Sequence, residues 1–258
     1  MRTLVMTWAM VKRYGIELKR YAFNTLSMLV SFYLIFLILF LGIRSFAGDS
    51  PQFGEALPGM VIGFTVFYLV VYAYAELSWV LIAEAQQGTL EQLSMSPLGF
   101  GRVIVARIFA ALAFRIVVMF ALLVIMMATT SRWLHVDLLT IVPVLILTVA
   151  SVQGVGFVMG GLALVFKQIQ AALGILQFVF VALLAIPLEQ FGFAKYLPLT
   201  WGTHLIGRAM VDGERLWQMP PRDLGALGVV GIGYFLVGFA CFKGLERVAR
   251  SRGLLGHY

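Results

Sequence analysis

The sequence predicts an all-α, polytopic membrane protein with about six transmembrane helices. Hydrophobic residues make up 61% of the chain and charged residues only 12%, and the mean hydropathy is +0.96. A soluble domain is roughly 45–50% apolar and about 25% charged. Several apolar runs also reach about 20 residues, the length at which a helix crosses a hydrocarbon core of roughly 30 Å. The surface that would face water in a soluble protein therefore faces lipid here.

Residues 1–258 are expected to form one transmembrane domain. Residues 1–21 mix apolar side chains with lysine and arginine, which is typical of an amphipathic helix lying on the membrane surface against anionic lipid headgroups. Residues 188–224 form a long, more polar connection, and we expect a helical or re-entrant segment at the outer face there. The expected transmembrane helices are residues 22–43, 58–83, 103–130, 138–166, 171–187 and 225–242.

The distribution of lysine and arginine predicts the orientation of these spans. If the N-terminus is cytoplasmic, most basic residues, including Arg107 and Lys243, fall on cytoplasmic segments, and most acidic residues fall on the other side. Basic residues near span ends concentrate on the cytoplasmic side of a membrane. We therefore expect both termini to be cytoplasmic. The expected location is a bacterial inner membrane. The pI of about 9.8 then reflects contact with anionic lipid and requires no nucleic acid.

The connection between the second and third spans, residues 84–99, is the most informative segment. Gly88 suits a helix C-terminus, because glycine readily adopts the left-handed conformation found there. Leu90 and Leu93 would form the apolar face of a following short helix, which Pro97 would end. On spacing alone two interpretations stay open: a short helix parallel to the membrane that binds a cytoplasmic partner, or a plain connector.

The pattern in this connection consists of Glu84, Gly88-Thr89-Leu90-Glu91, Leu93 and Ser96-Pro97-Leu98. It resembles the loop between spans two and three of ABC-2-type permeases, the membrane subunits of ATP-binding-cassette exporters. The likeness extends to the basic N-terminal helix, the six spans and the outer segment with Leu197-Pro198-Leu199-Thr200-Trp201. In that family the loop forms a coupling helix that docks in a cleft on the ATPase. The resemblance implies a coupling element made of Glu84, Gly88, Thr89, Leu90, Glu91, Leu93 and Pro97.

The energy source is expected to lie on another chain. A phosphate-binding P-loop needs Gly-x-x-x-x-Gly-Lys followed by Ser or Thr, and no Gly-Lys pair occurs in this sequence. We therefore expect no catalytic site and no bound cofactor here. The resemblance implies a separate ATPase subunit, in two copies, that binds ATP and magnesium. It also implies a second permease copy, as a homodimer or a related heterodimer, and an amphiphilic, lipid or glycan-type substrate that is moved outward.

Glu76 and Arg115 are charges within the expected spans, where each costs about 2.5–3.5 kcal/mol near the bilayer centre. Glu76 lies eight residues from Glu84, and Arg115 lies eight residues from Arg107. Both therefore lie roughly 12 Å along their helices from the same connection. We expect the two side chains to pair or to share a polar network facing the bundle interior. A packing role and a role in the transport pathway both remain open.

The aromatic side chains of the first span have two interpretations, and the glycines of two later spans have one. Phe32, Phe36 and Phe40 share one helix face by their spacing of four. They are candidate aromatics of the pathway, although lipid contact or helix packing is the favoured reading. Glycines in two spans are expected to permit close helix approach; they are Gly154, Gly156, Gly160, Gly161, Gly225, Gly228, Gly231, Gly233 and Gly238.

Other classes of function are less well supported by the residues. Cys241 is the single cysteine, and the three histidines are far apart, so we expect no metal site. An intramembrane enzyme would need a nucleophile or a metal set beside Glu76 and Arg115. The alternative function is an ion-driven secondary transporter, a class that often shows repeats and several intramembrane acids. Strict dependence of transport on ATP would separate that alternative from an exporter.

Overall fold

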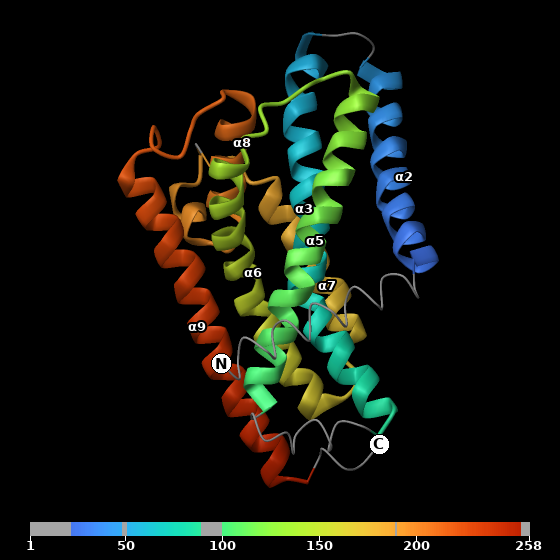
Figure 1. Ribbon diagram of the computed structural model, residues 1–258, viewed down its shortest axis with the longest axis vertical. Helices are drawn as coiled ribbons and strands as arrows, with labels where there is room; N and C mark the ends of the chain where they lie inside the picture. The colour runs from blue at the N-terminus through green and yellow to red at the C-terminus, as the bar shows by residue number, and fades with distance from the viewer. Residues whose placement is uncertain (1–21, 48–50, 89–99, 189, 254–258) are drawn as a thin grey trace.

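The computed structural model describes residues 22–47, 51–88, 100–188 and 190–253, and all regular structure within them is helical. Figure 1 shows an elongated bundle whose long helices run close to one direction. The predicted amphipathic helix at residues 1–21 lies outside the described residues. The helices are α2 (Ala22–Ala47), α3 (Pro51–Gln86), α5 (Phe100–Thr130), α6 (Leu138–Phe166), α7 (Gln170–Leu184), the 3-10 helix η1 (Gly192–Tyr196), α8 (Thr200–Val211) and α9 (Pro221–Ser251).

Five of these helices are long and apolar enough to cross a membrane, and the chain is an all-α, multi-pass membrane protein as predicted. The helix α6 covers the residues of the fourth expected span, whereas α9 begins four residues before the sixth expected span and ends well after it. The apolar pattern predicts only the part of a helix that lies in hydrocarbon, whereas α9 continues through the basic residues that follow that part. The candidate spans are Thr25–Phe46, Ala56–Gln86, Ile104–Thr130, Leu138–Phe166 and Pro221–Ser251.

The fifth expected span, residues 171–187, is shorter than predicted. Helix α7 has 15 residues, about 22 Å at the helical rise, which is less than the roughly 30 Å of a hydrocarbon core. It ends at Leu184, because Pro187 and the turn before it break the helix. The chain then reverses before α8 begins at Thr200.

Part of the segment that follows α7 is re-entrant. The backbone N–H of Leu199 donates to Ser151 Oγ at 3.1 Å, and Ser151 lies 13 residues, roughly 20 Å, along α6 from its start at Leu138. At the other end of α8, the His135 N–H donates to the Met210 carbonyl at 2.9 Å. Helix α8 therefore rises from the middle of α6 to its beginning. Leu199 and Ala194 are buried, as irregular backbone at membrane depth must be.

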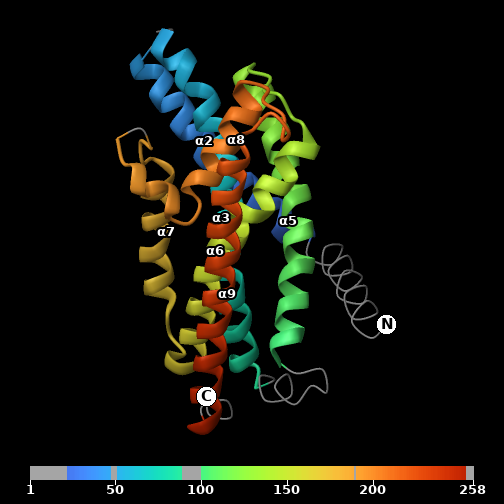
Figure 2. The ribbon, with the colours of Figure 1, turned by 90° about the vertical axis from the view of Figure 1, so that its left-hand side faces the viewer.

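Helix α6 lies at the centre of the bundle, between α3 and α9 (Figure 2). A Cβ added at Gly154 would overlap the Tyr234 carbonyl of α9, and one at Gly156 would lie 2.7 Å from the Ala73 carbonyl oxygen of α3. Glycine thus lets both helices approach α6 closely, as small residues do in membranes. Gly160, Gly161, Gly231 and Gly238 are also tightly packed, as predicted, whereas Gly225, Gly228 and Gly233 have open space around their Cβ positions and the prediction is wrong for them.

Candidate functional site

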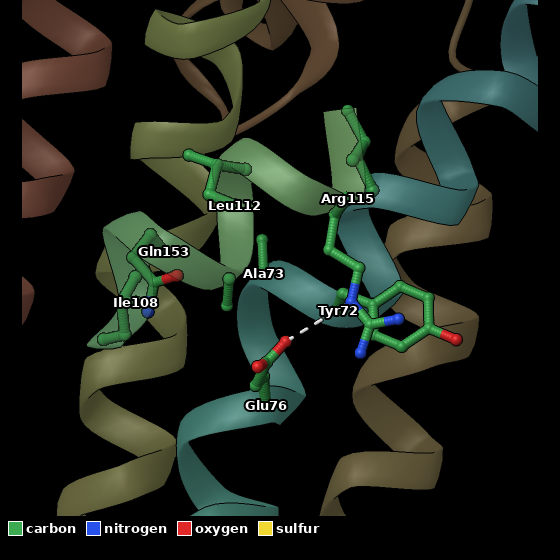
Figure 3. Close-up of a pocket in the computed structure, with 9 residues that line it drawn as sticks. Tyr72, Ala73, Glu76, Ile108, Leu112, Arg115 and Gln153 are labelled. Carbon is green, nitrogen blue, oxygen red and sulfur yellow. Dashed lines mark ion pairs between the residues drawn. The ribbon is translucent and has the colours of Figure 1, made fainter. Parts of the chain in front are cut away.

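The two charges within the spans meet between α3 and α5. Arg115 Nε lies 3.6 Å from Glu76 Oε2, and each side chain is 18% exposed. Figure 3 shows the pair where α3, α5 and α6 come together. The separation is that of an ion pair rather than of a hydrogen bond. Pairing in a low-dielectric region offsets much of the cost of placing either charge there alone.

An aromatic side chain completes the environment of the arginine. The Arg115 Cζ lies 3.7 Å from the centroid of the Tyr72 ring, which is well within cation–π range. Tyr72 lies one helical turn from Glu76 on α3, so both side chains point from the same helix face toward Arg115. The Tyr68 ring, one further turn along, packs against the Tyr72 ring with centroids 4.9 Å apart. One face of α3 thus supplies both the anion and the aromatic ring that hold this cation.

Helix α6 contributes one polar side chain to this region, Gln153. It is 6% exposed, and its Nε2 has no hydrogen-bond partner among the residues that the structure describes. A small cavity of about 20 Å³ lies between this amide, Tyr72, Glu76 and Arg115. A space of that size holds about one water molecule. The candidate site is therefore a compact polar centre inside an apolar bundle.

A second ion pair joins the same two helices near the connection between them. Arg107 Nη1 donates to Glu84 Oε1 at 3.3 Å. Because residues 76 and 84, and residues 107 and 115, are each eight apart, the antiparallel helices are linked twice, roughly 12 Å apart along their length. We call the end at which α3 stops and α5 starts the hairpin end. Two links on one helix pair favour movement of α3 and α5 as a unit.

The predicted coupling residues are only partly described. Glu84 lies in the last turn of α3 and makes the ion pair above, and Gly88 follows that helix with φ +69°, the left-handed conformation expected of a glycine after a helix end. The other members, Thr89, Leu90, Glu91, Leu93 and Pro97, lie outside the described residues.

The candidate pathway aromatics lie between α2 and α3. Phe36 and Phe40 are buried, and the Phe36 ring packs edge-on to Phe64 with centroids 5.6 Å apart. Phe32 packs edge-on to Tyr68 at 5.2 Å. These contacts favour the helix-packing reading over lipid contact for the two buried rings. They also connect α2, through Tyr68, to the surroundings of Arg115.

Sequence reasoning did not assign Tyr72 or Gln153 to the site. The signal for Tyr72 was its place one turn from Glu76, which puts a ring beside any partner of that carboxylate. The signal for Gln153 was a lone amide in the apolar run of α6, next to the glycine that packs on α9. Both depend on which helix faces contact one another.

Among the described residues, no group of three or more His, Cys, Asp or Glu side chains could hold a metal ion. The site's polar groups are an ion pair, an amide and phenols, which suit binding and positioning. A scan of protein-family models finds no match for the chain, and a search of curated proteins finds no matching sequence.

Proposed function

We propose that this chain is the membrane-spanning permease subunit of an ATP-driven exporter of the ABC-2 type. It would lie in a bacterial inner membrane with both termini in the cytoplasm and move an amphiphilic, lipid or glycan-type substrate outward. The chain would bind no nucleotide. A separate ATPase subunit, present in two copies, would bind ATP and magnesium and supply the energy.

The observation that best supports this proposal is the construction of the hairpin end. Helix α3 stops at Gln86 and α5 starts at Phe100, and the Glu84–Arg107 pair holds these ends together. The intervening segment carries the sequence pattern that resembles a coupling helix. A movement of that segment would therefore act on two helices that are fixed to each other. Such a link is needed if a conformational change in an ATPase subunit is to reach the membrane helices.

The polar centre would extend this movement into the membrane. The Glu76–Arg115 pair makes the second link between α3 and α5, so a push at the hairpin end would shift both helices together as far as this depth. Helix α3 also packs tightly on α6 at Gly156. Closure of the paired ATPases would thereby move α3 and α5, and α6 with them, and alter access from one face to the other.

A second permease copy is part of the proposal. Helices α2 and α7 expose large apolar side chains, such as Phe178, Ile175 and Ile38, and α2 is the least buried of the five candidate spans. Lipid or another copy can cover such faces equally well. We propose that a homodimer or a related heterodimer uses them, since the family works with paired permeases.

Co-purification tests the proposal. The native chain and a Leu90→Asp, Leu93→Asp double variant are extracted from native membranes in mild detergent, and their partners are identified by mass spectrometry. We expect an ATPase with a P-loop sequence beside the native chain and its loss from the double variant. The apolar face that would enter the ATPase cleft is charged in that variant.

A matched control carries the same charges at the opposite end of the bundle. Trp133 and Val136 are exposed in the loop between α5 and α6, so Trp133→Asp with Val136→Asp should keep the ATPase. All three proteins are checked for equal expression and thermal stability. Absence of any ATPase under several gentle conditions, or its equal loss from the control, would contradict the proposal. Glu76 as an intramembrane acid would then favour an ion-driven transporter.

A further inference from the structure

An apolar groove lies next to the polar centre. Side chains of α5, α6 and α9 line it, and its volume is about 200 Å³. Gln153 lines both this groove and the small cavity beside Glu76 and Arg115. Figure 3 shows Gln153 next to Ile108 and Leu112, which are also shared by the two spaces. The groove is therefore connected to the candidate site through this amide.

The groove faces the membrane and not the bundle axis. Its rim residues Phe109, Ile146 and Ile232 are 51%, 43% and 54% exposed, and in a multi-pass membrane protein such side chains contact hydrocarbon. Its floor contains Val149, which is 1% exposed, and Gln153. A ligand would enter sideways from the bilayer, and its apolar part would contact only apolar side chains.

Among the described residues that line the groove, Gln153 is the one with a polar side chain. Its Nε2 is buried and has no partner among the described residues, and an unmade hydrogen bond of a buried donor is costly. A water molecule needs two to four polar partners, which the groove side does not offer. An oxygen acceptor on an otherwise apolar ligand would satisfy the amide.

Depth restricts the ligand further. Gln153 lies 15 residues from the start of α6 and 13 from its end, roughly 20 Å from either. A phospholipid keeps its charged headgroup and ester groups at the interface and does not bring them this deep. A charged acceptor at this depth would carry the cost of an intramembrane charge, and Arg115 is already paired with Glu76. The acceptor must therefore be uncharged.

We propose that the groove between α5, α6 and α9 binds an uncharged lipophile with one alkyl chain and a carbonyl group, and that the carbonyl oxygen accepts a hydrogen bond from Gln153. The alkyl chain lies along the apolar lining and extends toward the lipid. This binding site requires neither ATP nor a partner subunit, so its test does not depend on the exporter function proposed above.

Photolabelling of the purified protein in lipid nanodiscs tests the site. The probe is a long-chain alkyl methyl ketone that carries a diazirine on its chain, and mass spectrometry locates the labelled residues. The competitors are the unlabelled ketone and the alkane of the same length. We expect labels on groove residues of α5, α6 and α9, and about fivefold stronger competition by the ketone, the ratio that one hydrogen bond of typical net strength gives.

Three variants separate the hydrogen bond from the space. Gln153→Leu keeps the apolar volume and removes the donor, so the groove should still be labelled while the ketone and alkane compete equally. Ala150→Phe fills the groove and should abolish the labelling there. Ala121→Phe, an equal enlargement at an exposed alanine of α5 outside the groove, should leave it unchanged. Melting curves show that each variant is folded.

Three results would overturn the proposal. One is labelling spread evenly over the lipid-facing helices and insensitive to Ala150→Phe. Another is equal competition by ketone and alkane for the native protein, as expected if water in the small cavity satisfies Gln153. The third is a ketone preference that survives Gln153→Leu in a protein that melts like the native one.

Discussion

Arg115 lies over the ring of Tyr72 with its Cζ 3.7 Å from the ring centroid, and the same guanidinium reaches Glu76 at 3.6 Å. Two neighbouring turns of α3 therefore hold one cation of α5, one by charge and one by the face of a ring. The Tyr72 hydroxyl has no hydrogen-bond partner among the described residues. The ring, and not the hydroxyl, is thus the part of Tyr72 that Arg115 uses.

Substitutions at Tyr72 should distinguish the ring from the hydroxyl. Tyr72→Phe keeps the ring face and removes a buried hydroxyl that has no partner among the described residues. The free energy of unfolding should therefore stay within about 0.5 kcal/mol of the native value or rise above it. Tyr72→Leu should lower it by about 1–2 kcal/mol, because a desolvated cation–π contact is lost. Unfolding in mixed detergent micelles measures both values. Equal losses from the two variants would show that the ring face does not matter.

Removal of one charge of the ion pair should cost more than removal of both. Glu76→Gln leaves Arg115 without its anion in an apolar bundle, and the free energy of unfolding should fall by about 2–3 kcal/mol. Glu76→Gln combined with Arg115→Gln should regain at least half of that loss, because two neutral amides can pair. The same micelle unfolding assay provides the full double-mutant cycle. Additive losses would contradict the coupling between the two side chains.

The contact between α6 and α9 depends on Gly154. An added Cβ there would overlap the Tyr234 carbonyl and lie 2.9 Å from the Phe235 amide nitrogen, and backbone cannot move aside as a flexible side chain can. Gly154→Ala should therefore lower the melting temperature and cost about 2–3 kcal/mol. Gly233→Ala on α9 has open space and should be neutral or stabilise by up to about 1 kcal/mol. Similar effects at both sites would refute close packing at Gly154.

The re-entrant turn before α8 should depend on Ser151. Ser151→Ala removes the acceptor of the buried Leu199 N–H and should lower the free energy of unfolding by about 1–3 kcal/mol. Hydrogen exchange at the beginning of α8 should become faster in the same variant. Ser31→Ala, at an exposed serine that donates to the Ser27 carbonyl within α2, serves as the control and should change stability by about 0.5 kcal/mol at most. Unchanged exchange in Ser151→Ala would mean that other contacts fix the turn.

Most of the fold follows from hydropathy, because a membrane span must bury a long apolar surface in lipid. The residues of α6 are those of the fourth expected span, and the other long helices differ mainly in their ends. The exception is the pair α7 and α8. An apolar run can predict that a segment enters the bilayer, but the return of the chain to Ser151 depends on a contact 48 residues apart in sequence.

The site divides in a similar way. The meeting of Glu76 and Arg115 could be expected from equal spacing along two antiparallel helices joined by a short connection. Gln153 could not, because its place depends on the direction in which α6 turns, and this is fixed where Gly154 and Gly156 contact α9 and α3. When a short connection joins two helices, equal spacing from it predicts which of their residues meet. Contacts with a third helix cannot be predicted in this way, because they depend on how that helix is rotated about its axis.

Crosslinking from Leu93 would test the central claim, a motor docked at the hairpin end, most directly. A photoreactive amino acid replaces Leu93 in living cells, and the crosslinked proteins are identified by mass spectrometry, with the same replacement at Trp133 as a control at the other end. The proposed function predicts an adduct between the Leu93 position and a separate protein with a P-loop sequence, and none from Trp133. Adducts of Leu93 with lipid or with this chain alone, at full expression, would contradict it.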